Sequence, residues 1–434
     1  MSVDPPKSLP AVPESLLPRE HAFYRPRHSE RQRGALVAAV VFFCTPLLLL
    51  VVGVRPGEFE NRKLAEFPAI TQGWDFFVGL DRWATDHLPL RQQAVIAADG
   101  ISRGVFGEPP KLKRETKVDG PVQLPAPPPT TTSAPQDRDA PMPSDFPDVI
   151  EGRRGWLYLG QDVRGACEPA MALDDVFARL RALRTAVESS GRKFVLVVAP
   201  NKSTMVPENL PTRYYGADCA APRREEFWNR LSAETGALDL RPGLRAAAQK
   251  AGGPVYSRLD THWNHDGGLV YTRALVEQIR PGATAGWKVE KGDVVDVPAD
   301  LPRLLGRTES ERVQTYTVAP DGKRSRSRAV DRPLEEPKRF VQLPGTGMVN
   351  TQVGMLGDSF SMHVLRDLVA PFSDLTLQDS DQLPKDPRRV ADMLAGKDVV
   401  VVEASERSLV AGVHPLLDQD VLGTITAELA ARPK

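Results

Sequence analysis

The sequence predicts an α/β protein whose largely parallel sheet is covered by helices on both faces. Three short runs of continuous apolar residues, FVLVVA (194–199), VGML (353–356) and VVVV (399–402), are typical of strands buried on both sides. Segments with helical periodicity alternate with these runs, as they do in parallel sheets. Polar residues follow at the ends of the predicted strands, where α/β proteins gather their chemistry.

The N-terminal part of the chain predicts a membrane anchor. Residues 1–33 are rich in Pro, Arg and Ser and indicate a disordered cytoplasmic tail. Residues 34–54, GALVAAVVFFCTPLLLLVVGV, carry no ionisable side chain except the Cys44 thiol. A helix of this length crosses the ~30 Å hydrocarbon core of a bilayer, so we expect a transmembrane helix; the alternatives are a buried core helix or a cleaved signal peptide. Arginines before the run place everything after it outside the cytoplasm.

The rest of the chain divides into three parts. Residues 55–108 contain apolar residues at helical spacing and predict a helical extracytoplasmic lead-in. Residues 109–145 include PAPPPTTTSAP, which cannot bury a core, and predict a Pro-rich linker. Residues 146–434 form the predicted main folded domain.

Within this domain, short apolar runs around a Gly-containing turn predict a hairpin over 149–160. The elements expected after it alternate between helix and strand: a helix over 173–189, a strand over 192–200, a helix over 223–235, a strand over 254–259, a helix over 267–279 capped by Asn264, a strand over 350–356 with a helix through 368, a strand over 397–405, and a helix after Asp418. Residues 283–342 are polar and predict short strands with a surface excursion.

The charge balance and the cysteines limit the function classes. The chain has 56 basic and 56 acidic residues, so its net charge does not favour nucleic acid as a partner. Cys167 and Cys219 would both face an oxidising compartment and either form a disulfide or remain two separate buried thiols.

Two predicted strand ends carry candidate catalytic residues. Asp260 and His262 follow one strand in Asp-Thr-His-Trp-Asn, and Ser359 lies at a strand-to-helix turn in Gly-Asp-Ser-Phe. A serine hydroxyl becomes a good nucleophile when a base such as His262 removes its proton. Asp260 would then orient the imidazole and stabilise its protonated form. These residue types alone do not establish a triad.

Other residues near these motifs have a functional and a structural interpretation. Asn201 would donate to an oxyanion or form a turn, and Lys202 would bind substrate or lie solvated on the surface. Arg213 and Tyr214 are candidates for sugar binding. We expect Asp358 to cap a helix, Trp263 to pack behind His262, and Glu403 to pair with Arg407. The histidines match no known zinc spacing, so we expect neither metal nor cofactor.

The motifs DTHWN and GDSF, in this order, resemble the alginate O-acetyltransferase family of SGNH-hydrolase-like proteins. The segments ENRKLAEFP, DHLPLRQ, GWLYLG, APNKSTMVPENLP and VVVVEASER resemble the same family, whereas the linker and residues 283–342 match poorly. The resemblance implies a flavodoxin-like SGNH sandwich, with Ser359 as nucleophile, His262 as base and Asp260 as the orienting acid. It also implies an acetyl-Ser359 intermediate, a membrane-bound O-acyltransferase as acetyl donor, and an exported polysaccharide as acceptor.

Three functions remain open from the sequence. The first is extracytoplasmic O-acetyl transfer to a cell-surface or exported polysaccharide. The second is a carbohydrate esterase that uses the same residues with water as acceptor. The third is a non-catalytic scaffold in a polysaccharide assembly complex. We expect no carbohydrate-binding domain after the predicted catalytic domain, which favours a membrane-tethered branch of the family and does not favour alginate itself as the acceptor.

Overall fold

A computed structural model describes residues 30–52, 54, 67–68, 76, 79–80, 83–84, 87, 146–330, 334 and 336–434. The chain divides into two compact units, Met1–Pro110 and Lys111–Lys434. Residues 1–29, most of the predicted lead-in and the whole predicted linker lie outside the described residues. The predicted domain boundaries therefore stay predictions.

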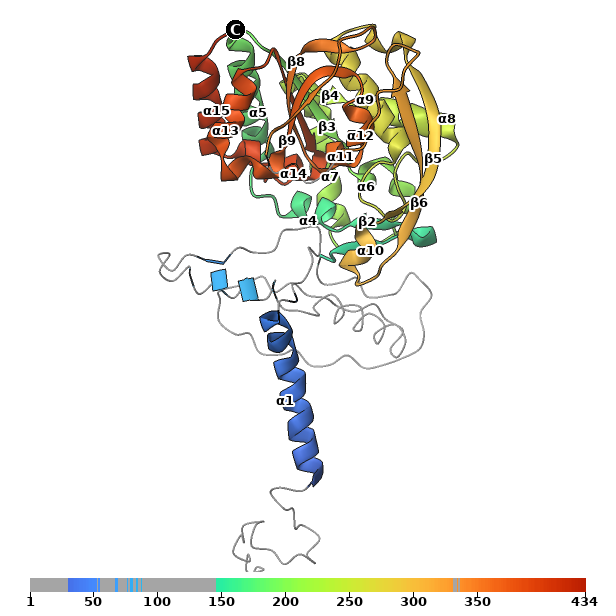
Figure 1. Ribbon diagram of the computed structural model, residues 1–434, viewed down its shortest axis with the longest axis vertical. Helices are drawn as coiled ribbons and strands as arrows, with labels where there is room; N and C mark the ends of the chain where they lie inside the picture. The colour runs from blue at the N-terminus through green and yellow to red at the C-terminus, as the bar shows by residue number, and fades with distance from the viewer. Residues whose placement is uncertain are drawn as a thin grey trace, which may run out of the picture. The chain divides into compact units, whose positions relative to one another are not determined.

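In the first unit, the predicted membrane segment forms helix α1 (Glu30–Val51), drawn in blue in Figure 1. Several of its apolar side chains are exposed, among them Leu36, Val40 and Leu48. Among the residues that the structure describes, however, no helix is long and apolar enough to cross a membrane. The predicted span over 34–54 is therefore not confirmed.

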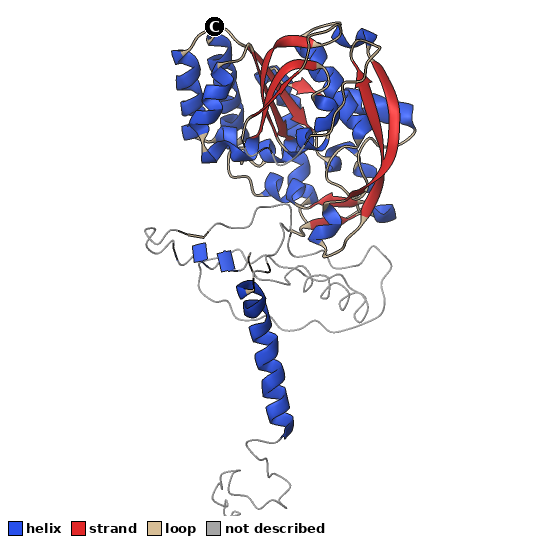
Figure 2. Cartoon of the chain, viewed as in Figure 1, coloured by secondary structure: helices blue, strands red, loops and turns tan. Residues whose placement is uncertain are grey.

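The second unit is built on a six-stranded sheet in the order β4-β3-β10-β8-β9-β7. Figure 2 draws strands in red and helices in blue. Its strands are β3 (Lys193–Ala199), β4 (Leu238–Asp239), β7 (Lys338–Val341), β8 (Val349–Gly357), β9 (Phe372–Asp379) and β10 (Val399–Ser405). Neighbouring strands are parallel except β7, which pairs antiparallel with β9 at the edge. The predicted, largely parallel sheet is therefore confirmed.

Helices cover both faces of this sheet because alternate residues of its central strands point into two separate cores. Leu196 and Val198 of β3 belong to one core, whereas Val195 and Val197 belong to the other. Figure 1 shows α5, α13 and α15 on one side and α8 and α9 on the other. The helices are α4 (Gln161–Cys167), α5 (Leu173–Ser189), α6 (Lys202–Met205), α7 (Ala217–Thr235), α8 (Arg241–Ala251), α9 (His265–Ile279), α10 (Leu301–Leu304), α11 (Ser359–His363), α12 (Leu365–Leu368), α13 (Pro387–Ala395), α14 (Glu406–Val410) and α15 (Gln419–Ala431).

Two antiparallel hairpins complete the unit. Strands β1 (Val149–Glu151) and β2 (Leu157–Leu159) form the hairpin that the sequence predicts. Strands β5 (Lys288–Pro298) and β6 (Ser310–Ala319) form a long hairpin within the polar stretch where only short strands were expected. The segment between β5 and β6 contains Asp300 and α10, and it returns to the turn that holds Asp260.

The strand predicted over 254–259 is wrong. This segment makes only an isolated bridge, between Tyr256 and Trp263. The Nζ atom of Lys202 instead donates to the carbonyls of Ser257, Arg258 and Asp260, at 3.1, 3.2 and 2.6 Å. A buried ammonium thus satisfies the backbone acceptors that a neighbouring strand would otherwise pair with.

Candidate active site

Three adjacent strands end at the same edge of the sheet and bring polar residues together. Asn201 follows β3, Arg407 follows β10 and Ser359 follows β8, and β10 lies between the other two. The backbone N–H of Arg407 donates to Asn201 Oδ1 at 3.2 Å, and Arg407 Nη2 donates to Ser359 Oγ at 3.2 Å. Parallel pairing therefore assembles residues that are far apart in the sequence.

Asp260 and His262 form a buried pair beside this edge. The Nδ1 atom of His262 lies 2.7 Å from Asp260 Oδ1, which also accepts the backbone N–H of His262 at 3.0 Å. Burial by itself would raise the pKa of Asp260, but the charge and hydrogen bonds of His262 together hold it below its ordinary value. Asp260 is thus a carboxylate that accepts a hydrogen bond from the Nδ1–H group of His262. The lone pair of Nε2 is then available to take up another proton.

Ser359 begins α11, and Asp358 caps this helix by accepting the N–H of Phe360 at 2.8 Å. The capping role expected for Asp358 is therefore confirmed. The ring of Phe360 lies edge-on to the imidazole of His262, with 4.9 Å between the centroids. Trp263 is fully buried and donates from Nε1 to the carbonyl of Phe360 at 3.2 Å, so it packs behind His262 as expected.

The hydrogen bond between Ser359 and His262 that a triad requires is not formed. The Ser359 hydroxyl accepts from Arg407, and Nε2 of His262 is buried without a partner among the described residues. Catalytic hydrogen bonds are often absent in unliganded enzymes and form when substrate binds. The contact with Phe360 keeps the imidazole beside the residue that follows the serine.

The turn that carries Asp260 is held from two sides. Lys202 is about 1% exposed and donates to three carbonyls of this turn, so it is neither the substrate-facing nor the solvated lysine that the sequence suggested. Burial lowers its pKa to about 8, against the opposing charges of Asp300 and Asp260. On the other side, Glu311 of β6 accepts hydrogen bonds from the backbone of Leu259 and Arg258, although burial dominates and raises its pKa.

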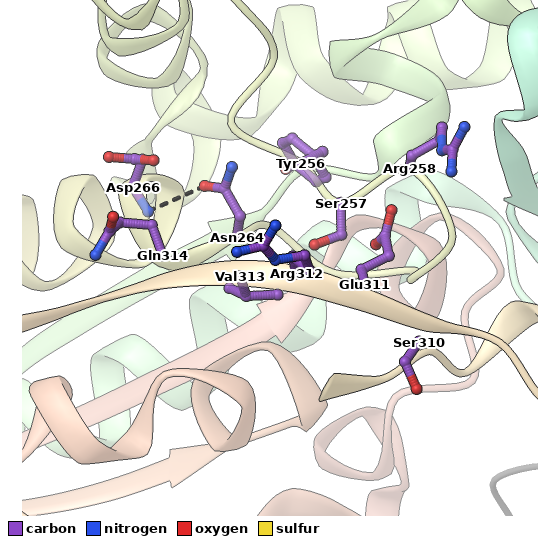
Figure 3. Close-up of a pocket in the computed structure, with 10 residues that line it drawn as sticks. All are labelled: Tyr256, Ser257, Arg258, Asn264, Asp266, Ser310, Glu311, Arg312, Val313 and Gln314. Carbon is purple, nitrogen blue, oxygen red and sulfur yellow. Dashed lines mark hydrogen bonds between the residues drawn. The ribbon is translucent and has the colours of Figure 1, made fainter. Parts of the chain in front are cut away.

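A polar pocket of about 520 Å³ lies between this turn and β6 (Figure 3). Its lining includes Ser257 and Arg258 from the turn and Glu311, Arg312 and Gln314 from β6. Neither Ser359 nor His262 lines it. Figure 3 also shows the cap of α9, in which the side chain of Asn264 accepts a hydrogen bond from the backbone N–H of Asp266.

Asn201 and Arg407 each carry a buried donor with no partner among the described residues. These donors are Nδ2 of Asn201 and Nη1 of Arg407. Glu406 accepts the backbone N–H of Asn201 at 2.8 Å and so fixes this residue against α14. Unpartnered buried donors are costly, and they are typical of sites that receive a ligand or a developing negative charge.

The ion pair expected between Glu403 and Arg407 is absent from the described residues. Glu403 is fully buried and accepts the N–H of Asp358 at 3.0 Å and the Ser361 hydroxyl at 2.6 Å. Burial and the charge of Asp358 raise its pKa well above the usual range. Arg407 is therefore a site residue that sequence reasoning missed, and its place after the strand VVVVEAS was the available signal.

The remaining candidates lie elsewhere. Arg213 is exposed, Tyr214 packs against the core that contains Leu210 and Ala220, and their role in sugar binding stays a prediction. Cys167 and Cys219 form a disulfide with 5.2 Å between their Cα atoms, which decides between the two alternatives left by the sequence.

One group of side chains has the composition of a metal site. Ligand atoms of Asp260, His262 and His363 lie within 4.8 Å of one another, and the rings of the two histidines stack with 5.1 Å between centroids. In this group Nδ1 of His262 is already bonded to Asp260.

Residues 149–367, half of the chain, match the family described as SGNH hydrolase-like domain, acetyltransferase AlgX. A probable alginate O-acetylase AlgJ from Pseudomonas putida is 26% identical over 167 residues, which cover 37% of this chain and 42% of that protein. The protein of the same description from Pseudomonas aeruginosa is 28% identical over 194 residues, covering 40% and 48%. The matched region thus spans less than half the length of these relatives.

Several solved structures are similar to this chain, among them one from Pseudomonas putida and one from Bacillus cereus. The O-acetyltransferase domain of Pseudomonas putida AlgJ has a TM-score of 0.43 and 23% identity, covering 61% of this chain and 93% of that one. Bacillus cereus PatB1 has a TM-score of 0.38 and 14% identity, covering 59% and 95%.

Proposed function

Because the chain belongs to the family of SGNH hydrolase-like domains of the acetyltransferase AlgX, we propose that it is an O-acetyltransferase that acts on a polysaccharide outside the cytoplasm. In this proposal Ser359 is the nucleophile, His262 the general base and Asp260 its orienting carboxylate. The acetyl group passes through an acetyl-Ser359 intermediate.

One observation carries the proposal. The imidazole of His262 has its Nδ1 side bonded to Asp260 and its Nε2 side buried without a partner among the described residues, while its ring contacts Phe360, the neighbour of Ser359. Acyl transfer requires a base that is held in one tautomer. Its acceptor nitrogen must be unused and must lie beside the serine, here at a helix N-terminus.

The reaction then takes two steps. In the first, Nε2 of His262 removes the proton of Ser359 as Oγ attacks the carbonyl carbon of the donor ester. The oxyanion that forms receives hydrogen bonds from the unpartnered donors Asn201 Nδ2 and Arg407 Nη1. The C–O bond of the donor breaks, and its alkoxide takes the proton from His262.

In the second step a hydroxyl of the acceptor sugar loses its proton to His262 and attacks the acetyl-serine. The Ser359–acetyl bond breaks, and the proton returns to Oγ. Asp260 stabilises the imidazolium in both steps. Transfer rather than hydrolysis requires that water be kept from the acetyl-serine until the sugar binds.

The proposal extends to partners and location. A membrane-bound O-acyltransferase would supply the acetyl group, and the acceptor is a cell-surface or exported polysaccharide. The Cys167–Cys219 disulfide supports an extracytoplasmic site, because disulfides persist in oxidising compartments and are rare in the cytosol. The apolar run over 34–54 supports a single-pass anchor with its N-terminus in the cytoplasm, although the described helices do not include a membrane span.

The test uses the full chain with p-nitrophenyl acetate as donor. We expect an acetyl adduct on Ser359 by intact mass and peptide mapping, and p-nitrophenol release that falls by several orders of magnitude in Ser359→Ala. Ser325→Ala, at an exposed serine, is the matched control and should keep the parent rate.

Addition of candidate polysaccharides then separates the two enzymatic functions. A transferase moves the acetyl group to the glycan faster than to water, whereas an esterase releases only acetate. If Ser359→Ala keeps the parent rate, the nucleophile is wrong and the non-catalytic scaffold becomes the better explanation.

A further inference from the structure

A second carboxylate, Asp300, lies against the turn that carries Asp260 and His262. It comes from the segment between β5 and α10. Asp300 Oδ1 accepts the backbone N–H of Thr261 at 2.8 Å, and the backbone N–H of Asp300 donates to Asp260 Oδ2 at 3.2 Å. The two segments are therefore joined by reciprocal hydrogen bonds at the two residues that precede His262.

The second carboxylate oxygen of Asp300 lies near the imidazole. This Oδ2 atom lies 3.9 Å from Nδ1 of His262, next to the 2.7 Å contact made by Asp260. The side chains of His262, Asp260 and Asp300 are 7%, 11% and 17% exposed. Charges in such a buried place are weakly screened, so a carboxylate at this distance interacts strongly with a protonated imidazole.

We propose that Asp300 is a positioning residue for His262: it holds the turn through Thr261 and places a second negative charge beside Nδ1, which stabilises the imidazolium formed when His262 takes the proton of Ser359. The inference rests on the proposed acetyl transfer and deepens it. Asp300 does not contact the reacting atoms and acts only through the imidazole and the turn.

The behaviour of the two carboxylates supports this role. Burial and the negative charge of Asp260 raise the pKa of Asp300, whereas the charge of His262 lowers it. Protonation of His262 therefore favours ionisation of Asp300, so that negative charge increases beside the imidazole when the imidazole becomes positive.

Other charged groups also lie around Asp260 and Asp300. Lys202 reaches this pair from α6, His363 from α11 and Glu311 from β6. A variant of Asp300 keeps all three side chains, and the loss of its negative charge also lowers the pKa of Lys202 further. A shift in the pH dependence of such a variant therefore reports the charge at position 300.

The experiment compares Asp300→Asn with Asp296→Asn in the full chain. The amide of Asn keeps an oxygen that accepts from Thr261 but loses the charge, and Asp296 is an exposed residue of β5 that serves as the matched control. Acetylation of Ser359 by p-nitrophenyl acetate is followed in a single turnover from about pH 5 to about pH 9. Thermal unfolding of each variant is measured alongside.

We expect Asp300→Asn to acetylate roughly ten-fold more slowly than Asp296→Asn, with the acid limb of its pH profile moved to lower pH because the protonated imidazole has lost a stabilising charge. The melting temperature should stay close to that of the control. In an Asp260→Asn background the same change should cost more than ten-fold, because Asp300 is then the remaining carboxylate beside Nδ1.

A rate within two-fold of the control, or a slower rate with the acid limb unchanged, would overturn the proposal. If Asp300→Asn does not fold, Asp300→Ser keeps a side-chain acceptor for Thr261 and takes its place. Failure of the parent reaction is distinguished by Ser359→Ala. If that variant keeps the parent rate, the proposed acetyl transfer fails; if it is inactive while Asp300→Asn is normal, only the role of Asp300 fails.

Discussion

The Arg407 guanidinium donates from Nη2 to Ser359 Oγ at 3.2 Å, and its central carbon lies 5.2 Å from the centre of the Phe360 ring. The arginine is thus attached to both residues at the start of α11. This contact holds the serine hydroxyl at the carboxyl edge of the sheet. The other terminal nitrogen of Arg407, Nη1, has no acceptor among the described residues.

The first prediction concerns this arginine. Replacement of Arg407 by Met should slow acetylation of Ser359 by roughly 100-fold, because both the contact to the hydroxyl and a donor for the oxyanion are lost. Arg407→Lys keeps the charge but not the forked geometry and should recover only part of the rate. Single-turnover mass spectrometry measures both, with Arg388→Met at an exposed position as control. Equal rates in Arg407→Met and the control would contradict this role.

The second prediction separates the two functions of Asn201. Asn201→Asp keeps an oxygen for the backbone N–H of Arg407 but removes the Nδ2 donor, so we expect kcat to fall by roughly 10²–10³-fold with a smaller change in KM. Steady-state kinetics with p-nitrophenyl acetate measures this split. Asn229→Ala, at an exposed position of α7, should behave like the parent. A change confined to KM would assign Asn201 to substrate binding instead.

The third prediction uses the buried lysine. Lys202→Met leaves three carbonyls without their donor and should lower the free energy of unfolding by roughly 2–3 kcal/mol. Urea unfolding measures this loss, with the exposed Lys250→Met as control. Activity should fall as well, since the turn that carries Asp260 loses its support.

The pH dependence of this effect has a definite sign. The pKa of Lys202 is about 8 in the folded chain and has its ordinary value of 10.5 when unfolded. Between these values the unfolded chain binds more protons, so this group makes the parent more stable as pH rises. The stability difference between the parent and Lys202→Met should therefore grow from about pH 8 to about pH 10.5. A constant difference would show that the lysine titrates normally.

The fourth prediction concerns the disulfide between Cys167 and Cys219, which closes a sequence separation of 52 residues. Loop-closure entropy gives an upper value of about 4 kcal/mol for its contribution to stability. Cys167→Ser with Cys219→Ser should lower the urea midpoint accordingly, and a reductant should do the same to the parent. Cys44→Ser removes the exposed free thiol and should leave the midpoint unchanged. An unchanged midpoint in the double variant would show that the bond adds no stability.

The sequence by itself determined three buried strands of the sheet and the local pairs. Continuous apolar runs identified β3, β8 and β10, because strands buried on both faces have no polar side to display. Asp260 and His262 are two residues apart, so their hydrogen bond needs only a tight turn. The caps by Asn264 and Asp358 also follow from short-range geometry.

The tertiary structure decided which distant residues meet. The strand order places β10 between β3 and β8, and this order alone brings Arg407 to both Asn201 and Ser359. Burial of Lys202 and the approach of Asp300 likewise depend on packing between segments that share no local pattern. Hydrophobic periodicity reports which face of an element is buried, but not which other element covers it. The partners of a charged side chain are therefore fixed only when the sheet and its connections are complete.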